Sequence, residues 1–518
     1  MAVPTDQEIE RLGSTAKPFF SAKFSAGKVV LQGLGNCTLG KKVPRTTGDL
    51  DDGIFLDWHW DGCRLVVRND RFGLYPLFYS CVGSEVWVSP SIVEVLRGNS
   101  KRQLNLPALA VFYRLGHFVG EDTPFTDVHF LPPNSILTWQ DGKSILEAGP
   151  NASDQTISSD LSFNDAVDKY VHLFAQSVAR RLPADENFTV PISGGRDSRH
   201  ILFELVKQGY TPKVCPTVKY RPPATNEDTR IARLITAKLG IGHVELNKPP
   251  SFFQAVLKDV HLTNYCGGGH GWILPVAAML NNKVSTMYDG LAGSVLSGGF
   301  MLAGAKFEFF RAQKLEELAE LILRENRLEE ANKQVLAKAL YDSMPMDLAI
   351  KRLVTELRKH VSARNPMLSF NFWNRTRRCV ASIPFAILSE IPVVYCPYLD
   401  HELFDFLVSL DESMMAGNRL HDETIRRAYP QHADIPFEDA TLKATFTNFD
   451  RTYYRTSRKE FASYLMRRGW SGLDAVRPQY LFPKLLLEWS QNVAASPWYM
   501  RTALHAIEVD ALRRVGQD

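Results

Sequence analysis

One strand–turn–helix unit constrains what this chain of 518 residues can fold into more than any other feature. An apolar, strand-like run at 188–192 leads directly into the turn Ser-Gly-Gly-Arg-Asp-Ser at 193–198. Apolar residues at helical spacing follow this turn, and Gly209 ends the pattern. A second strand is expected at 214–218 and a second helix at 226–239. Because strands and helices alternate, the sequence predicts an α/β fold with a parallel sheet.

The turn itself has the composition of a phosphate-binding loop. Gly194 and Gly195 let the backbone approach a ligand closely, so that successive N–H groups form an anion-binding site. The N-terminus of the following helix adds its dipole to the same place, and Ser193 and Ser198 add hydroxyl donors. Asp197 would repel phosphates unless it bound a cation, so Mg²⁺ is its natural partner. We therefore predict a site for ATP and Mg²⁺. The alternative is an ordinary glycine turn capped by Asp or Ser.

The first part of the chain differs in character from the rest. It is β-rich, and its short apolar runs are separated by Gly, Asp and Ser; they lie at 54–56, 64–67, 86–88 and 135–139. The polar stretch 149–160 has almost no large apolar side chains, so we expect it to be a linker. The predicted domains are therefore 1–150 and 161–518.

The glycine turn resembles the pyrophosphate loop of the asparagine synthetase-like enzymes, whose pattern is SGGxDS. Residues 289–299 resemble the second loop of that family, and Pro-Tyr-Leu-Asp-His at 397–401 resembles its later PFLDH segment. In the first domain, residues 68–79 resemble the RDxxGxxPLYY stretch of its glutaminase half. The resemblance implies a degenerate glutaminase-like (class II amidotransferase) β-sandwich. A parallel-sheet ATP-pyrophosphatase domain with a helical C-terminal extension is then expected to follow.

The resemblance also implies roles for individual residues. The expected nucleotide contacts are Ile192, Ser193, Gly194, Gly195, Asp197, Ser198, Val218 and Gly290. The expected catalytic residues are Ser193, Asp197 and Lys443, the last in the place of a lysine that stabilises leaving pyrophosphate. Asp197 and Asp289 are the expected metal ligands. His270 lies in a Gly-rich segment on the acceptor side of the family's site, so we expect it to contact substrate. The alternative for His270 is a solvated side chain in a turn.

The sequence departs from the family at two places. Active glutaminase halves expose an N-terminal cysteine, whereas residue 2 here is alanine, so we expect no glutaminase activity. In the second loop, three apolar or neutral residues stand where the family has carboxylates or, in some members, a catalytic tyrosine: Leu291, Ser294 and Val295. Asp289 could replace the missing metal ligand. Glu390 is a weaker candidate for the missing catalytic base.

The amino-acid composition limits the kinds of binding partner that we expect. The net charge is only +3, from 60 Lys+Arg and 57 Asp+Glu, which gives no reason to expect a nucleic-acid or membrane partner. The 7 cysteines include no CxxC pair, which is typical of free thiols in a reducing compartment, so we expect a cytoplasmic location. The oligomeric state and the role of residues 446–518 stay open.

These observations predict an AMP-forming, Mg-ATP-dependent carbon–nitrogen ligase. It would adenylate a substrate carboxylate and couple it to an amine of a small molecule or peptide. Three alternatives remain: a nucleotide-binding protein that has lost catalysis, an ammonia-dependent asparagine synthetase, and an enzyme that transfers sulfur to RNA. The last needs paired reactive cysteines and a basic surface, and the sequence shows neither. The sequence does not identify the acid or the amine.

Overall fold

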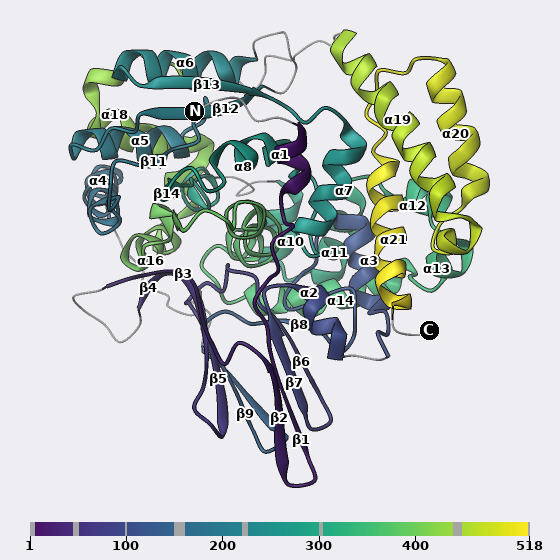
Figure 1. Cartoon of the computed structure of the whole chain (residues 1–518). Coiled ribbons are helices and arrows are strands. Elements are labelled where there is room, and N and C mark those ends of the chain that lie inside the picture. The colour runs from purple at the N-terminus through teal and green to yellow at the C-terminus, as the bar shows by residue number, and fades with distance from the viewer. Residues whose placement is uncertain are drawn as a thin grey trace.

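The computed structural model describes residues 6–44, 51–98, 101–149, 161–219, 226–299, 304–438 and 448–515. A β-rich N-terminal part projects from an α/β part, and long C-terminal helices stand at one side of the molecule (Figure 1). Every helix in the described ranges is either too short or too polar to cross a membrane.

The N-terminal part is a sandwich of two antiparallel sheets of five strands each. One has the order β2-β1-β7-β6-β8 and the other β10-β9-β5-β4-β3. Their bounds are β1 (Phe20–Ser25), β2 (Lys28–Gly33), β3 (Asn36–Val43), β4 (Asp52–Trp60), β5 (Arg64–Asn69), β6 (Phe78–Val82), β7 (Glu85–Ser89), β8 (His129–Phe130), β9 (Ser135–Gln140) and β10 (Lys143–Ala148). Alternate residues of β5 and β9 point into one core with β1 and β7. The β-rich prediction for this part is confirmed.

Helix α3 (Leu106–Leu115) also lies in the first 150 residues, but it packs on α14 (Met346–Leu357) and α11 (Leu315–Glu325) and contacts the last helix, α21 (Tyr499–Arg514) (Figure 1). Asn105 caps its start by accepting from Ala108 N, and Gly116 ends it with φ 84°. Its Phe112 ring stacks on His505 of α21, with ring centroids 4.0 Å apart. The hydrophobic core therefore joins the N-terminal third of the chain to its last helix.

The α/β part is built on parallel strands. β11 (Phe188–Thr189), β14 (Thr286–Tyr288) and β15 (Val393–Tyr395) form one sheet, and β12 (Val214–Lys219) pairs with β13 (Gly242–Asn247). Beyond β11, Ile192 N donates to Pro216 O of β12 (2.9 Å), which joins the two sheets in the order β13-β12-β11-β14-β15. The parallel sheet is confirmed. β11 is shorter than predicted because Pro191 has no N–H with which to continue the ladder.

Helices surround this sheet and extend toward the C-terminus. The elements before α9 are α1 (Asp6–Arg11), α2 (Ile92–Val95), α4 (Phe163–Ala179), α5 (Asp197–Lys207), α6 (Glu227–Leu239), α7 (Phe252–Leu262) and α8 (Leu274–Leu280). The later ones are α9 (Gly293–Ser297), α10 (Ala305–Arg311), α11 (Leu315–Glu325), α12 (Glu329–Val335), α13 (Lys338–Asp342), α14 (Met346–Leu357), α15 (Pro366–Phe370), α16 (His401–Ser409), α17 (Glu412–Met415), α18 (Arg419–Ala428), α19 (Asn448–Arg468) and α20 (Pro478–Ser490). A π-helical segment, η5 (Asn371–Val380), follows α15. The predicted helices after the glycine turn and at 226–239 are α5 and α6, and Gly240 ends α6 with φ 66°.

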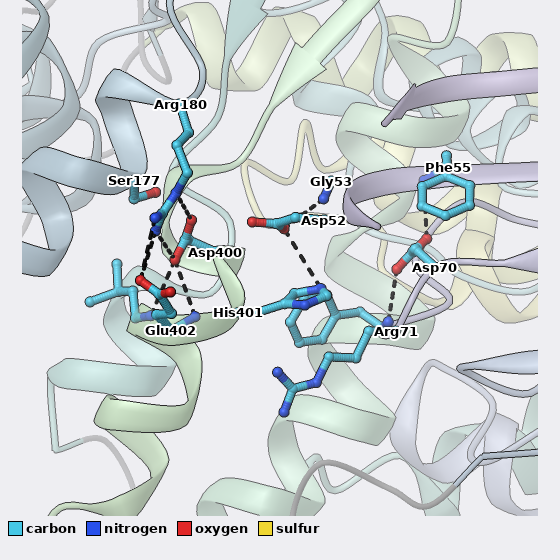
Figure 2. Close-up of polar contacts among 12 residues, drawn as sticks. Asp52, Gly53, Phe55, Asp70, Arg71, Ser177, Arg180, Asp400, His401 and Glu402 are labelled. Carbon is cyan, nitrogen blue, oxygen red and sulfur yellow. Dashed lines mark hydrogen bonds and ion pairs between the residues drawn. The ribbon is translucent and has the colours of Figure 1, made fainter. Parts of the chain in front are cut away.

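A buried cluster of ion pairs links the sandwich to the α/β part. Arg181, 2% exposed, lies between two carboxylates that are each 1% exposed: Asp52 of β4 at 2.7 Å and Asp400 at 2.8 Å. Figure 2 shows Asp52 facing His401, whose Nε2 is 3.6 Å from Asp52 Oδ1, and Arg180 lying on Asp400. The segment 397–401 thus connects the sandwich to the edge of the α/β sheet.

Candidate functional site

The turn at 193–198 is braced by its own hydroxyl groups. Ser193 N donates to Ser198 Oγ (3.1 Å), and the two serine Oγ atoms are 3.0 Å apart. Gly195 N donates to Ser193 Oγ (3.2 Å). Helix α5 begins at Asp197, so its N-terminus faces the turn. The sequence SGGRDS therefore gives a compact loop with a helix N-terminus behind it.

Gly194 lies against the start of α6. A Cβ atom at this position would be 3.0 Å from Asp228 Cα and 3.1 Å from Ile231 Cβ, so a side chain there would require α6 to shift. Gly194 N donates to Asp228 Oδ1 at 2.5 Å. Burial raises the pKa of Asp228. The first glycine of the turn is thus explained by close packing, and it brings a second carboxylate to the loop.

Asp197 lies under the second loop, 289–299. Its Oδ2 accepts hydrogen bonds from Ser294 N (3.0 Å) and Ser294 Oγ (2.8 Å), while Oδ1 has no hydrogen-bond partner in the part of the chain that the structure describes. Burial raises the pKa of Asp197 to about 6, although the bonds from Ser294 lower it. A Cβ on Gly290 or Gly293 would lie 2.6 Å from side-chain atoms of Asp197. Both glycines are required for this approach.

Asp289 lines the same cleft from the carboxyl end of β14. Its Oδ1 accepts from Leu291 N (2.8 Å), and burial raises its pKa to about 6. The charge of Asp289 in turn raises the pKa of Asp197. Two half-buried carboxylates that disfavour each other's charge are suited to sharing a cation. Within the described ranges, no group of three or more His, Cys, Asp or Glu side chains is arranged to hold a metal ion. An ion at Asp197 and Asp289 would need phosphate oxygens and water as further ligands.

The cleft has a volume of about 360 Å³ and lies at the carboxyl ends of the parallel strands. Its polar side chains include Ser193, Asp197, Ser198, Asp228, Asp289 and Ser294. Its apolar side chains include Ile192, Val218, Trp272, Ile273, Val276 and Val380. A molecule with a flat apolar end and a charged end matches this lining. The carboxyl edge of a parallel sheet is also the usual place for a ligand in such folds.

The second loop has no titratable side chain at the three positions where the sequence departs from the expected pattern. Leu291 is 3% exposed and belongs to the hydrophobic core, and Val295 is half-buried. Ala292 adopts φ 73°, a left-handed conformation that is strained for a residue with a Cβ. Ser294 is the exposed residue of the three. Its hydroxyl orients Asp197, which is a role that the sequence did not predict.

His270 lies in a second, larger cavity of about 670 Å³. Of the predicted nucleotide residues, Gly194 and Gly195 do not line the first cavity, and the other six do: Ile192, Ser193, Asp197, Ser198, Val218 and Gly290. The backbone N–H groups of His270 and Gly269 donate to Asp259 Oδ2, and His270 Nε2 is 3.2 Å from Cys379 Sγ. Burial lowers the pKa of His270, but Cys379 and Asp259 raise it above its ordinary value. Arg375 of η5 lines both cavities, so the two sites adjoin. Segments of π-helix are frequent at functional sites.

The remaining candidates lie elsewhere. Lys443 is outside the described residues. Glu390 does not line the cleft and accepts from Thr15 Oγ1 (3.3 Å) at the surface. His200 is fully buried and stacks on Phe174, with centroids 3.6 Å apart, which is a structural role. His421, which the sequence did not single out, lies 3.7 Å from Asp197 Oδ1; burial lowers its pKa to about 3, so it is neutral there.

Comparison with known families identifies the region that carries the loop. Residues 169–263 match the family model of asparagine synthase. This region is asparagine synthetase-like. It runs from α4 to α7 and contains the 193–198 turn, Asp228 and Asp259. The family consists of ATP-dependent, amide-forming ligases, so the asparagine synthetase-like region confirms the predicted resemblance at that level. Among curated proteins, none matches the chain.

Proposed function

We propose that the chain is an Mg-ATP-dependent carbon–nitrogen ligase that cleaves ATP to AMP and pyrophosphate. The observation that carries the proposal is that Asp197 and Asp289 line one cleft at the carboxyl edge of the sheet, where one oxygen of Asp197 has no hydrogen-bond partner among the described residues. An ATP phosphate chain brought to the 193–198 turn would lie between these carboxylates and the N-terminus of α5.

Asp197 and Asp289 are the residues that would hold Mg²⁺. The ion, when bound, neutralises phosphate charge and makes pyrophosphate a better leaving group. Ser294 keeps Asp197 in position through its hydroxyl and its N–H. The apolar side of the cleft, with Val218 and Trp272, would cover the base. These residues bind and orient; the chain contributes positioning and charge complementarity.

The proposed reaction has two steps. A substrate carboxylate oxygen forms a bond to the α-phosphorus as the bond from that phosphorus to the bridging oxygen breaks, and pyrophosphate leaves with the electron pair. An amine then forms a bond to the acyl carbon, AMP leaves, and the amine nitrogen loses a proton. Arg375 stands where the nucleotide cleft meets the larger cavity, which suits it to holding the incoming carboxylate. The test is release of pyrophosphate from ATP that depends on an added acid.

Leu291 favours a second candidate, a nucleotide-binding protein without catalysis. Its buried side chain occupies a place where the family has a titratable group. Such a protein would bind an ATP analogue with Mg²⁺ and release no pyrophosphate with any acid and amine. Exchange of labelled pyrophosphate into ATP distinguishes the two, because only an enzyme that forms the adenylate catalyses it.

We predict that glutamine is not a nitrogen donor. A cysteine nucleophile reacts as the thiolate, and the cysteines of the sandwich have raised pKa values that keep them protonated. Burial raises the pKa of Cys37 to about 11 and also raises that of Cys81. A hydrogen bond to Asp61 raises the pKa of Cys63. Glutamate release should therefore stay at background in a coupled assay. Ammonium chloride serves as the comparison donor. Release that is lost when one of these cysteines is changed to serine would contradict the prediction.

We predict that Ser294→Asp lowers the Mg²⁺ concentration needed for half-maximal pyrophosphate release, by roughly tenfold. Ser294 now donates its hydroxyl to Asp197 Oδ2, so an aspartate there would place a second carboxylate on the same side of the site. With Mg²⁺ bound, that carboxylate adds a ligand; without it, the two carboxylates repel. Ser294→Asn, which has the same size and no charge, is the control. A Mg²⁺ requirement that is equal in both variants would mean that Asp289 already completes the site.

A further inference from the structure

The larger cavity is an amphipathic chamber built by distant parts of the chain. Helices α3, α7, α11, α15 and α21 and segment η5 contribute to its lining. Its walls are largely apolar and include Phe112, Val256, Ile322, Met367, Phe370 and Trp498. Its volume of about 670 Å³ is in the range of sites that enclose a whole small molecule. The C-terminal region beyond residue 446 thus supplies part of a binding cavity through α21 and the residue before it.

Two guanidinium groups of this cavity are free to bind a ligand. Arg375 and Arg501 are both exposed, and neither guanidinium group makes a hydrogen bond or ion pair within the described ranges. Arg501 lies over the ring of Phe252, 5.4 Å from its centroid. Gly269 has φ 97°, and a Cβ atom at this position would lie 3.3 Å from Arg501 Nη1. The missing side chain of Gly269 therefore leaves room for Arg501. Arginine is well suited to binding carboxylates through paired N–H groups.

Apart from the two arginines and Asp259, the ionisable groups of the cavity include an ion pair and two neutral histidines. Lys306 Nζ is bonded to both carboxylate oxygens of Glu325 at 2.6 Å. Burial lowers the pKa of His117 and of His505 to about 4, so both rings are uncharged at neutral pH. The accessible charge that a ligand meets is therefore positive and comes from the two arginines, while the buried Asp259 carboxylate interacts with Arg501.

Asp259 is the one carboxylate of the lining, among the described residues, without a basic hydrogen-bond partner. Its Oδ2 accepts from two backbone N–H groups, and its Oδ1 has no hydrogen-bond partner. The side chain is 1% exposed, however, and Oδ1 is buried. An ammonium group would have to displace packed atoms to reach it, whereas both arginines are accessible. The accessible charges favour an anionic ligand.

We propose that the cavity binds an acid with an apolar body and two anionic groups. Arg375 takes the carboxylate that reacts, at the boundary with the nucleotide cleft, and Arg501 takes the second anionic group. The apolar walls hold the body of the molecule between them. This inference rests on the proposed function for the role of Arg375, and it adds the chemical class of the substrate.

Direct binding to the full chain tests this proposal without nucleotide. The probes are linear dicarboxylic acids from succinic to tetradecanedioic acid, compared by calorimetry with monocarboxylic acids of the same lengths. We expect the diacids of matching length to bind at least roughly tenfold more tightly, the factor that one additional charged hydrogen-bonded contact gives. In Arg501→Met that advantage should disappear while monoacid affinity is unchanged. Arg501→Lys should recover part of it.

Three outcomes would overturn the proposal: equal affinities for diacids and monoacids, an equal loss of both in Arg501→Met, or tighter binding of ω-amino acids, which would point to Asp259. Circular dichroism confirms that the variants fold. Binding of a non-hydrolysable ATP analogue with Mg²⁺ is measured separately on the same samples. Diacid binding without ATP-analogue binding would leave the cavity assignment standing and refute the ligase, so the two failures are distinguishable.

Discussion

Asp197→Ala should abolish Mg²⁺-dependent binding of ATP and lower pyrophosphate release by more than roughly a hundredfold. The side chain lines the cleft, one of its oxygens has no hydrogen-bond partner, and no other carboxylate among the described residues lies at the N-terminus of α5 and in contact with the second loop. The fold should survive because the hydroxyl of Ser294, which loses its acceptor, is exposed and can bind water. Asp197→Asn keeps the shape and removes the charge, so it should be equally inactive.

Titration calorimetry with a non-hydrolysable ATP analogue, with and without Mg²⁺, measures the effect. Asp168→Asn is the control, since this carboxylate of the same region is 66% exposed on α4 and lies outside the cleft. Unchanged affinity in Asp197→Ala would show that 193–198 is an ordinary turn. It would also remove the basis of the proposed ligase.

The second large effect concerns stability. Arg181→Met should lower the free energy of unfolding by about 3–5 kcal/mol, because it leaves Asp52 and Asp400 buried without their shared cation. Arg180→Met is the matched control: its side chain is 28% exposed and contacts the same Asp400, so its removal should cost only about 1 kcal/mol. Adding Asp52→Asn to Arg181→Met should recover part of the loss, since one of the two buried charges is then gone.

Urea unfolding followed by circular dichroism compares the four proteins at one protein concentration. Comparable losses from Arg181→Met and Arg180→Met would mean that water reaches the cluster and that burial does not amplify the interaction. A double variant less stable than Arg181→Met would mean that Asp52 has another essential partner.

The local parts of the site could be predicted from the sequence because their residues are neighbours in the chain. The 193–198 turn, the start of α5 at Asp197 and the end of α6 at Gly240 each depend on a few consecutive residues. Glycine spacing and helix stop signals encode them directly. The hydrogen bond from Ser294 to Asp197 joins residues 97 positions apart, and only the packed loop shows that the serine orients the aspartate.

The second cavity could not be predicted for a similar reason. Arg375 belongs to a short basic cluster with Arg377 and Arg378, and Arg501 stands alone in helical sequence; a solvated helix face is the ordinary environment of such residues. Their significance comes from α21 packing beside α7 and from the position of η5 between two cavities. No periodicity or motif encodes contacts of that kind. The structure puts His270 in the same cavity as these arginines, and its predicted contact with substrate stays a prediction.

The packing of α3 on α21 has a consequence for synthesis of the chain. Tyr113 Oη lies 3.3 Å from His505 Nδ1, although 392 positions separate the two residues. At roughly 5–20 residues per second, a ribosome needs about 20–80 s to make the intervening chain. The hairpins of the sandwich can pair during that time, since their strands are close in sequence. The contacts of Phe112 and Tyr113 with His505 have to wait for α21, and a chain that terminates before Tyr499 would leave these two rings of α3 without that partner.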